Sequence, residues 1–452
     1  MTDAQDPGTD GDAPAEANSE PFRGNASAAA QSRADMVSGG IAVGMVLASN
    51  RIILLVLYVV LARVLGASGL GVYAFAISLV TLVSILSELG FPLLVEREIA
   101  KSSASNEWGH GKGMIYVAGV AQLVVGGASC VLLVALSGFF EHSLSIVIAA
   151  LLIPLLGLFR VGCHVLSGAH EIVLSRLMEY GVRPLLVMVS VVLAFLINPE
   201  WRTPEAALTI QVIVIFVTLL VLYLIIQRVV PTPMRRSNAR FRLGAWWRSA
   251  VTLTFGVAAV TINTQFDVII LGWFYPSSDV GIYRIASQGA ALIGLAFLAA
   301  NMYLSPQFSK LWAGDRRSDL QRLVTQAVRW VSIISIATAA LLGWVGEWLL
   351  GTFFGEAFVV GYMPMMVLAC GYVIASISGA FGSLLNMTGH EREAAKAIAV
   401  GAVVNVVLSL ALVPPFGMEG AAYGTLIAAL VWHLLLSRGI RRTIGIRPTV
   451  AG

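Results

Sequence analysis

Long apolar segments recur along almost the whole chain, and they constrain its fold more than any other feature. Crossing a bilayer core of about 30 Å takes about 20 apolar residues in a helix. The runs do not alternate with a period of two, so we expect helices rather than barrel strands. The twelve predicted spans are 39–64, 70–95, 113–138, 144–168, 177–197, 205–227, 249–274, 280–306, 325–350, 358–386, 397–414 and 417–437.

The composition agrees with a protein that is apolar throughout. Of the 452 residues, 58% are hydrophobic and only 12% are charged, whereas soluble domains carry about 25% charged residues. A soluble enzyme with one anchor would not be apolar along its whole length. We therefore predict an all-α, polytopic membrane protein with about twelve transmembrane helices.

Lysine and arginine residues gather at one side of these spans. With both termini inside the cell, 25 of the 29 lie at or near cytoplasmic ends, and only Arg63, Arg202 and Arg284 lie near outer ends. Positive charge favours the cytoplasmic side. This pattern predicts a multi-pass protein of the plasma (inner) membrane with both termini cytoplasmic. The net charge of +4 follows from this topology and requires no nucleic-acid partner.

The chain divides into five predicted parts. The acidic start, rich in Pro, Gly, Ala and Ser, is expected to be disordered and to lack the basic start of a signal peptide. The basic linker carries five arginines, and its contact with anionic lipid headgroups is one reading beside a purely topogenic role. The parts are a cytoplasmic tail (1–37), a six-helix lobe (38–229), a basic cytoplasmic linker (230–248), a second six-helix lobe (249–438) and a basic cytoplasmic tail (439–452).

Arg51 lies inside the first span. The apolar run 52–62 covers only about 16 Å at 1.5 Å per residue, so the helix must extend back through Arg51 to cross the membrane. A cation at mid-membrane costs at least about 2.5 kcal/mol and usually faces a cavity or a partner. Arg51 thus predicts either a cavity that holds an anionic cargo or a structural ion pair, for example with Glu88 or Asp267.

An internal repeat relates the two halves. At an offset of 210 residues, GVYAFA (71–76) corresponds to GIYRIA (281–286). Each copy follows the junction between the first and second helix of a six-helix half. Six is an even number, so the two halves have the same orientation. Two such lobes around a central cavity form a familiar transporter plan.

The repeat, the spans and several local patterns resemble one known family. The matching stretches are LARVLGASGLGVYAFAISLV (61–80), ELGFPLLVEREIA (88–100), FDVIILGWFYPSSDVGIYRIAS (266–287) and GHEREAAKAIAVGAVVNVVLSLALVPPFGMEGAAYGT (389–425). They are similar to the polysaccharide (O-antigen-type) flippases of the multidrug/oligosaccharidyl-lipid/polysaccharide exporter superfamily. The resemblance covers about residues 38–440.

This resemblance implies a function as well as a fold. The expected activity is alternating-access transfer of a lipid-diphosphate-linked oligosaccharide from the cytoplasmic to the outer leaflet, for surface polysaccharide biosynthesis. The expected partners are that lipid, membrane lipids, and a polysaccharide polymerase and glycosyltransferases. Ala74 and Phe75 depart from the family, which often has a basic or polar residue after this GxY. That departure weakens any site proposed at the outer end of the second helix.

Polar residues inside the spans are the candidate site residues. Each also has a structural reading, an interhelical hydrogen bond or an ion pair. For Asp267, that reading is a salt bridge with Arg63 or Arg284. The candidates for lining the cavity are Arg51, Asn50, Glu88, Arg160, His164, Asn263, Gln288 and Asn301, and the candidates for ion coupling or gating are Asp267, Arg63 and Arg284.

Two other functions stay open. An ion-coupled multidrug efflux antiporter of the same superfamily would favour acidic cavity residues for its cationic cargo. A membrane glycan-handling transferase would need acidic catalytic residues or a large outer loop, and the predicted outer loops are short. No Walker motif, catalytic set or metal-ligand pattern is present in the sequence, so we expect a non-enzyme without cofactors or metals.

Overall fold

The fold is described by a computed structural model that covers residues 20–378 and 380–446. Within these ranges, the secondary structure consists of helices, and no strand occurs. Residues 1–19 of the predicted acidic tail and residues 447–452 of the predicted basic tail lie outside the described ranges. Helix α1 begins at Glu20, inside the predicted tail.

The first half of the chain forms nine α-helices and four short helical segments. π-helical turns (η1 and η3) continue two of the spans, and 3-10 turns (η2 and η4) precede others. The elements are α1 (Glu20–Glu88), α2 (Phe91–Ser105), α3 (Trp108–Ala121), η1 (Gln122–Gly126), α4 (Gly127–Leu136), η2 (Ser137–Phe139), α5 (Ser143–Ala150), α6 (Leu152–Gly168), α7 (Ile172–Arg176), η3 (Leu177–Val182), α8 (Arg183–Ile197), η4 (Pro199–Trp201) and α9 (Pro204–Val229).

The short helix α10 (Thr232–Arg236) lies in the predicted linker, and α11 begins before that linker was expected to end. The second half is formed by α11 (Leu243–Phe274), α12 (Ser277–Ala291), α13 (Gly294–Ala313), α14 (Arg317–Leu349), η5 (Leu350–Phe354), η6 (Glu356–Gly361), α15 (Tyr362–Ser378), α16 (Ala380–Met387) and α17 (Glu391–Thr443).

The prediction of twelve spans is confirmed. In the described residues, nine helices are long and apolar enough to cross a membrane. Two of them are double, because α1 changes direction at Gly66 (φ 69°, ψ −176°) and α17 at Gly417 (φ 56°, ψ −129°). Only glycine adopts such angles readily. The consecutive helices α12 and α13 supply the remaining span.

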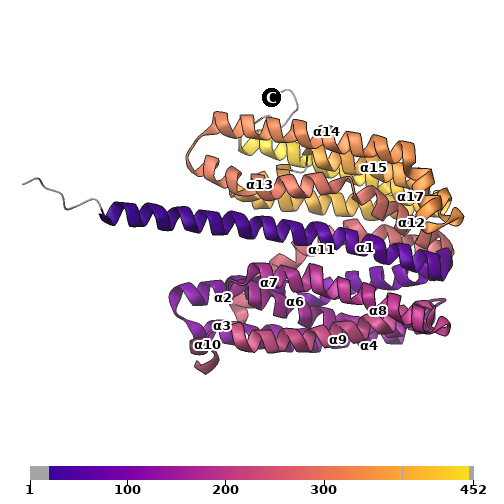
Figure 1. Ribbon diagram of the computed structural model, residues 1–452, viewed down its shortest axis with the longest axis horizontal. Helices are drawn as coiled ribbons and strands as arrows, with labels where there is room; N and C mark the ends of the chain where they lie inside the picture. Colours follow the sequence, from indigo (N-terminus) through magenta and orange to yellow (C-terminus); the bar gives the residue numbers. More distant parts are fainter. Residues whose placement is uncertain (1–19, 379, 447–452) are drawn as a thin grey trace, which may run out of the picture.

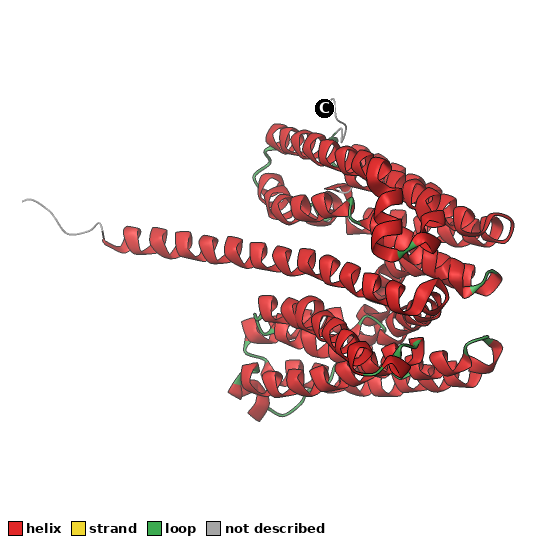
Figure 2. Ribbon diagram, turned by 45° about the vertical axis from the view of Figure 1, so that its right-hand side comes forward, coloured by secondary structure: helices red, strands yellow, loops and turns green. Residues whose placement is uncertain are grey.

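The helices form two lobes (Figure 1). The helices α2–α10 lie in one group and α12–α17 in the other, with α1 and α11 between them. Figure 2 shows α1 entering between the lobes, while its N-terminal end extends beyond them. The two-lobe prediction is thereby confirmed. Below, the end of the molecule that holds Gly66 and Gly417 is called the outer end, following the predicted orientation.

In the described residues, the apolar core that both lobes share lies at the outer end. One core contains residues of both lobes, among them Leu61, Leu70 and Tyr283. At the opposite end, each lobe has a separate core, represented by Met114 in the first and Phe308 in the second. Burial of apolar surface therefore holds the lobes together at the outer end and leaves the cytoplasmic halves as separate units.

The repeat is visible as a reciprocal contact between the lobes. A Cβ on Gly71 would lie 1.6 Å from the carbonyl oxygen of Ser277, and one on Gly281 would lie 2.1 Å from that of Ala67. Adding 210 to Gly71 gives Gly281, and adding 210 to Ala67 gives Ser277, so the offset exchanges the glycine and the carbonyl between the two contacts, as expected for a two-fold crossing. Gly71 and Gly281 thus hold equivalent positions, which confirms the predicted repeat.

Contacts on both sides of this crossing complete an outer seal. Ser68 and Ser277 share a hydrogen bond of 2.9 Å across the lobes. Arg63 of α1 donates from Nε to the carbonyl oxygen of Phe353 (2.8 Å) and from Nη2 to that of Thr352. On the other side, Trp273 of the second lobe packs edge-on against Phe140 of the first, with ring centroids 5.8 Å apart. We call these residues, together with Gly71 and Gly281, the outer seal.

The orientation gives a testable prediction. In a variant whose native cysteines are replaced, a cysteine at Ser237 in the linker should resist a membrane-impermeant thiol reagent added outside the cell. A cysteine at Ser278, or at the exposed Glu200 before α9, should react. Cysteines at all three positions should react after the membrane is opened. Labelling of the Ser237 site in intact cells, with protection of the other two, would reverse the topology.

Candidate substrate-binding site

Arg51 lies on α1 between the lobes and has no fixed counter-charge. Its side chain is exposed, and it forms no hydrogen bond or ion pair within the described part of the chain. The predicted ion pairs with Glu88 or Asp267 are wrong, because Arg160 pairs with Glu88 and Tyr283 binds Asp267. The charge of Arg51 does reach Tyr372 on α15 of the second lobe. The guanidinium is therefore available to an anion between the lobes.

A second arginine lies between the lobes, closer to the outer seal. Arg284 of α12 donates from Nε to the hydroxyl of Tyr58 on α1 (3.0 Å), and its guanidinium lies 5.5 Å from the centre of the Tyr58 ring. Its charge also acts on Tyr372. Tyr58 is two helical turns from Arg51 on the same helix. Two arginines and two tyrosines thus occupy the inter-lobe region beneath the outer seal.

A charged pocket of about 260 Å³ lies between the first lobe and α11. Arg160 of α6 donates to Glu88 at 2.8 Å, and both residues line this pocket. Arg183 also lines it, with a guanidinium 5.7 Å from the Phe159 ring and a buried Nε that has no hydrogen-bond partner. A buried cation with an unused donor is suited to an anion.

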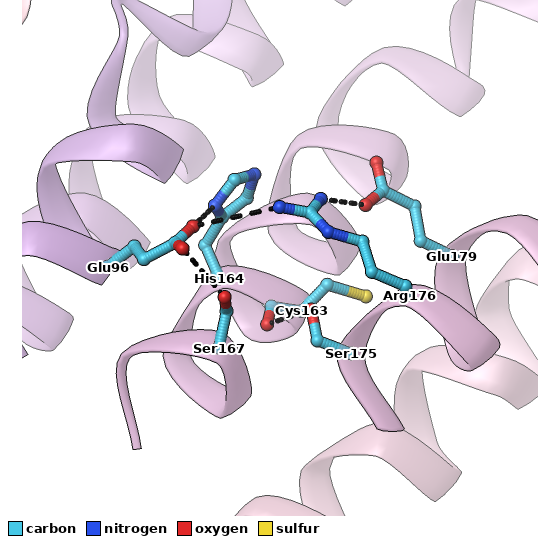
Figure 3. Close-up of polar contacts among 7 residues, drawn as sticks. All are labelled: Glu96, Cys163, His164, Ser167, Ser175, Arg176 and Glu179. Carbon is cyan, nitrogen blue, oxygen red and sulfur yellow. Dashed lines mark hydrogen bonds and ion pairs between the residues drawn. The ribbon is translucent and has the colours of Figure 1, made fainter. Parts of the chain in front are cut away.

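A network of polar side chains continues from this pocket toward the cytoplasmic end (Figure 3). Glu96 of α2 lies 2.6 Å from His164 Nδ1 and accepts a hydrogen bond of 2.7 Å from Ser167, both on α6. Arg176 of α7 lies with its Nη2 atom 4.0 Å from Oε2 of Glu96 and with its Nη1 atom 3.2 Å from Oε2 of Glu179. The network connects α2, α6, α7 and η3 and fixes their relative positions.

Glu96 lies just beyond the predicted second span. Its partial burial opposes ionisation, but the hydrogen bonds from His164 and Ser167 and the charges of His164 and Arg176 outweigh this effect and lower the pKa of the Glu96 carboxyl. Glu96 therefore stays ionised at neutral pH. Glu96 and Glu179 both lie near Arg176, and Glu179 also lines the pocket, so the pocket and the network together hold three arginines and three glutamates.

Asp267 lies in a separate pocket of about 160 Å³ inside the second lobe. Its Oδ2 accepts hydrogen bonds from Tyr283 (2.6 Å) and Thr425 (3.3 Å), and the amide of Val268 donates to Oδ1 at 2.8 Å. The side chain is 5% exposed. The predicted salt bridges to Arg63 and Arg284 are wrong, because Arg63 binds backbone carbonyls and Arg284 binds Tyr58.

A side chain with an unused oxygen atom, Asn405, also lines this pocket. Asn405 donates from Nδ2 to Thr425 at 3.3 Å, which leaves its Oδ1 buried and without a partner. Ser409, one turn further along α17, also has a buried hydroxyl without a partner. In the described residues, no group of three or more His, Cys, Asp or Glu side chains is placed to hold a metal ion. A single carboxylate with neutral oxygens nearby suits a proton or a monovalent cation.

The other predicted polar residues lie apart from these clusters or bond locally. Asn263 lines the Asp267 pocket, but its Nδ2 donates to the carbonyl of Ala259 on its own helix. Asn301 accepts from Ser305 one turn away. Asn50 has a buried Oδ1 without a partner, and Gln288 is half-buried. The structure therefore brings together Glu88, Arg160 and His164, but not the full predicted set.

Sequence reasoning missed several residues of these clusters. Glu96, Arg176, Glu179 and Tyr372 were not among the candidate residues. The i,i+3 spacing of Arg176 and Glu179 was a usable signal for a local ion pair. The approach of Glu96 to His164 joins residues 68 positions apart, and no local pattern predicts it.

Comparison with known proteins places this geometry in a family. Residues 36–312 match the polysaccharide biosynthesis protein family, which is more than half of the chain. The chain belongs to this family. A second family, MatE, matches residues 253–411.

A curated relative matches part of the chain. A probable low-salt glycan biosynthesis flippase of Haloferax volcanii is 23% identical over 181 residues, which are 40% of this chain and 38% of the relative. The match thus spans well under two thirds of that relative's length.

Two solved structures share the fold over nearly the whole chain. An inward-facing multidrug resistance MATE family transporter of the MOP superfamily has a TM-score of 0.71 at 15% identity and covers 89% of this chain and 98% of its own. The lipid II flippase MurJ, in an inward closed conformation, has a TM-score of 0.68 at 13% identity and covers 89% of this chain and 87% of its own.

Proposed function

We propose that this protein transfers a lipid-diphosphate-linked oligosaccharide from the cytoplasmic to the outer leaflet of the plasma membrane. The observation that carries the proposal is Arg51, a cation between the lobes of a membrane protein without a fixed counter-charge. The cost of keeping it there is offset when an anionic cargo binds. Membership in a polysaccharide biosynthesis family and the match to a probable glycan flippase support the same cargo class.

The proposed path begins at the cytoplasmic ends of the lobes, which have separate cores. The diphosphate meets Arg160 and Arg183 in the first-lobe pocket and then Arg51 between the lobes. Arginine suits this task because its planar donor fork matches phosphate oxygens. The lipid tail stays in the bilayer, and the oligosaccharide follows the diphosphate. Gln288 is proposed to meet a sugar hydroxyl group along this path.

The proposed cycle alternates between two closures. In the structure, the outer seal is closed, so the inter-lobe region is shut from the outside. Opening requires the Gly71–Gly281 crossing and the Arg63 contact to separate while the cytoplasmic halves approach. The lobes proposed to rock are 38–229 and 249–438, joined by the linker 230–248. No covalent chemistry takes part, and a polymerase and glycosyltransferases are proposed to act before and after transfer.

Multidrug efflux is the second candidate, and the MatE match favours it. An efflux antiporter would carry cationic compounds, and these need acidic groups exposed between the lobes. Arg51 and Arg284 are the charged groups that we identify there, and they repel such cargo. The glycan flippase is therefore the better-supported function. Export of cationic dyes by cells that overproduce the protein would favour the second candidate.

The Asp267 pocket is the proposed coupling site, for a proton or a sodium ion. Moving one charge across the membrane potential is worth about 2.3 kcal/mol per 100 mV, a bias of about fiftyfold. A cation on Asp267 would change the interactions of Tyr283, which follows Gly281 in the outer seal by two residues. Binding in this pocket would thereby be linked to the crossing between the lobes.

Replacing Asp267 with asparagine should uncouple transfer from the ion gradient. The amide keeps the size of the side chain and can still accept from Tyr283, so the fold should persist. We expect export of surface polysaccharide to fall by about tenfold or more. The matched control is Asp279→Asn, the same change at an acidic residue near the start of α12 outside this pocket. Gradient-dependent export at the normal rate by Asp267→Asn would rule out this coupling site.

Deletion of the gene tests the proposed function as a whole. We expect the loss of a surface polysaccharide and the accumulation of its lipid-diphosphate-linked precursor in the cytoplasmic leaflet. Re-expression of the intact chain should reverse both effects. Unchanged surface polysaccharide and unchanged precursor levels would contradict the proposal.

A further inference from the structure

A groove of about 640 Å³ lies on the first lobe, apart from the inter-lobe region and from both charged pockets. Helices α3, α6 and α9 form its walls and floor, and α10 closes its cytoplasmic end. Figure 1 shows α3 and α10 next to each other at one end of this lobe. The walls belong to membrane-spanning segments, so the groove opens toward the bilayer in its cytoplasmic half.

The length of the groove is mostly apolar. Its lining includes Ile115 of α3, Val161 and Val165 of α6, and Leu219 and Ile226 of α9. Gly162 lets α9 approach α6, because a Cβ there would lie 2.7 Å from a methyl carbon of Leu222. Gly119 of α3 has no atom within 4 Å of the position of its missing Cβ. The floor is therefore tightly packed, whereas the α3 side is open.

The charged side chains that line the groove are both positive and lie at its cytoplasmic end. Lys112 donates from Nζ to the carbonyl oxygens of Arg235 (2.7 Å) and Ser237 (2.9 Å). An ammonium group has three donors, so one remains for another acceptor. The side chain of Arg235 is exposed beside it. The exposed Tyr116 and Tyr223 flank the apolar part, a position typical of aromatic residues at a membrane interface.

We propose that this groove binds one anionic phospholipid of the cytoplasmic leaflet. The headgroup phosphate is held by Lys112 and Arg235, and an acyl chain lies along α6 between α3 and α9. The cytoplasmic leaflet is the anionic one, and each nearby Lys or Arg adds about 1 kcal/mol of attraction to it. A zwitterionic lipid fits the apolar part equally well but gains less from the two cations.

The bound lipid would stabilise the linker between the lobes. Lys112 already fastens α10 to α3 through two backbone carbonyls. A phosphate shared by Lys112 and Arg235 adds a bridge between the same two elements. The start of α11, which follows this linker, packs on the first lobe through Trp246. The lipid would therefore fix the point from which the second lobe begins.

The test compares lipid retention by purified full-length protein and two variants. Arg235→Ala removes a side-chain cation but keeps the carbonyl that Lys112 uses. Gly119→Trp fills the open side of the groove and leaves both cations in place. The matched controls are Arg236→Ala, an exposed neighbour that does not line the groove, and Gly127→Trp, at another open helical glycine outside it.

Native mass spectrometry in detergent with added phosphatidylglycerol or phosphatidylcholine provides the readout. We expect the intact protein to retain one phosphatidylglycerol in preference to phosphatidylcholine. Arg235→Ala should weaken this retention by about fivefold, Gly119→Trp should abolish it, and both controls should behave like the intact protein. Equal retention of the two lipids by the intact protein, or unchanged retention in Gly119→Trp, would overturn the proposal. Because the groove is remote from Arg51, this outcome is independent of the proposed cargo.

Discussion

Arg51→Ala should abolish polysaccharide export while the protein remains folded and inserted in the membrane. Arg51 forms no ion pair within the described residues, so its removal leaves no partner unsatisfied. Charge-assisted hydrogen bonds contribute about 1.5–3 kcal/mol each, and the loss of a two-donor contact to the diphosphate should reduce transfer by about a hundredfold or more. Surface polysaccharide per cell, normalised to the amount of protein in the membrane, is the measurement.

Companion variants at Arg51 distinguish charge from geometry. Arg51→Lys keeps the charge but loses the planar fork, so partial export is expected. Arg51→Glu repels the cargo and should be inactive. The control is Arg228→Ala, at an exposed arginine at the end of α9. Normal export by Arg51→Ala would show that the diphosphate does not depend on this residue. Loss of the protein from the membrane would instead indicate a structural role.

Gly71→Val should also bring export to background, by preventing the outer seal from closing. The added Cβ would overlap the backbone oxygen of Ser277, at 1.6 Å, and backbone cannot move aside as a flexible side chain can. Gly281→Val should have the same effect because it occupies the equivalent position. The expected defect is in the conformational cycle, so the variants should still reach the membrane.

A cysteine pair can report on the seal directly. Ser68 and Ser277 lie 2.9 Å apart at their hydroxyls, so cysteines at both positions should cross-link in an otherwise cysteine-free protein. The cross-link should form poorly when Gly71→Val is added. Gly127→Val, at a helical glycine with open space around it, is the control for helix propensity. Efficient cross-linking and normal export in Gly71→Val would mean that this crossing is not needed for transfer.

The sequence predicted the spans and the repeat well because both depend on local information. Hydrophobic runs long enough to cross a membrane are read directly, and GVYAFA and GIYRIA placed Gly71 and Gly281 at equivalent positions before any contact was known. The turns at Gly66 and Gly417 mark ends of predicted spans to within a few residues. The backbone shows in addition that a non-helical glycine, rather than a longer loop, turns the chain between the two spans.

The pairing of polar residues was harder to predict because it depends on packing between distant segments. Glu88 was a candidate partner for Arg51, but it binds Arg160, which is 72 positions away. Arg284 was expected near the outer end and in a salt bridge, yet it contacts Tyr58 across the lobes. A helical wheel shows which residues share a face. It does not show which other helix that face will pack against.

The leaflet position of the cargo shows directly whether the protein transfers it and whether transfer needs Arg51. Purified protein is reconstituted into vesicles that contain the lipid-diphosphate-linked oligosaccharide isolated from the deletion strain, and an impermeant glycan-cleaving enzyme reports how much cargo is accessible from outside. We expect the intact protein to make the protected half of the cargo accessible. Vesicles with the Arg51→Ala variant should stay at the level of protein-free vesicles. Equal accessibility with intact protein, with Arg51→Ala and without protein would contradict the proposed function.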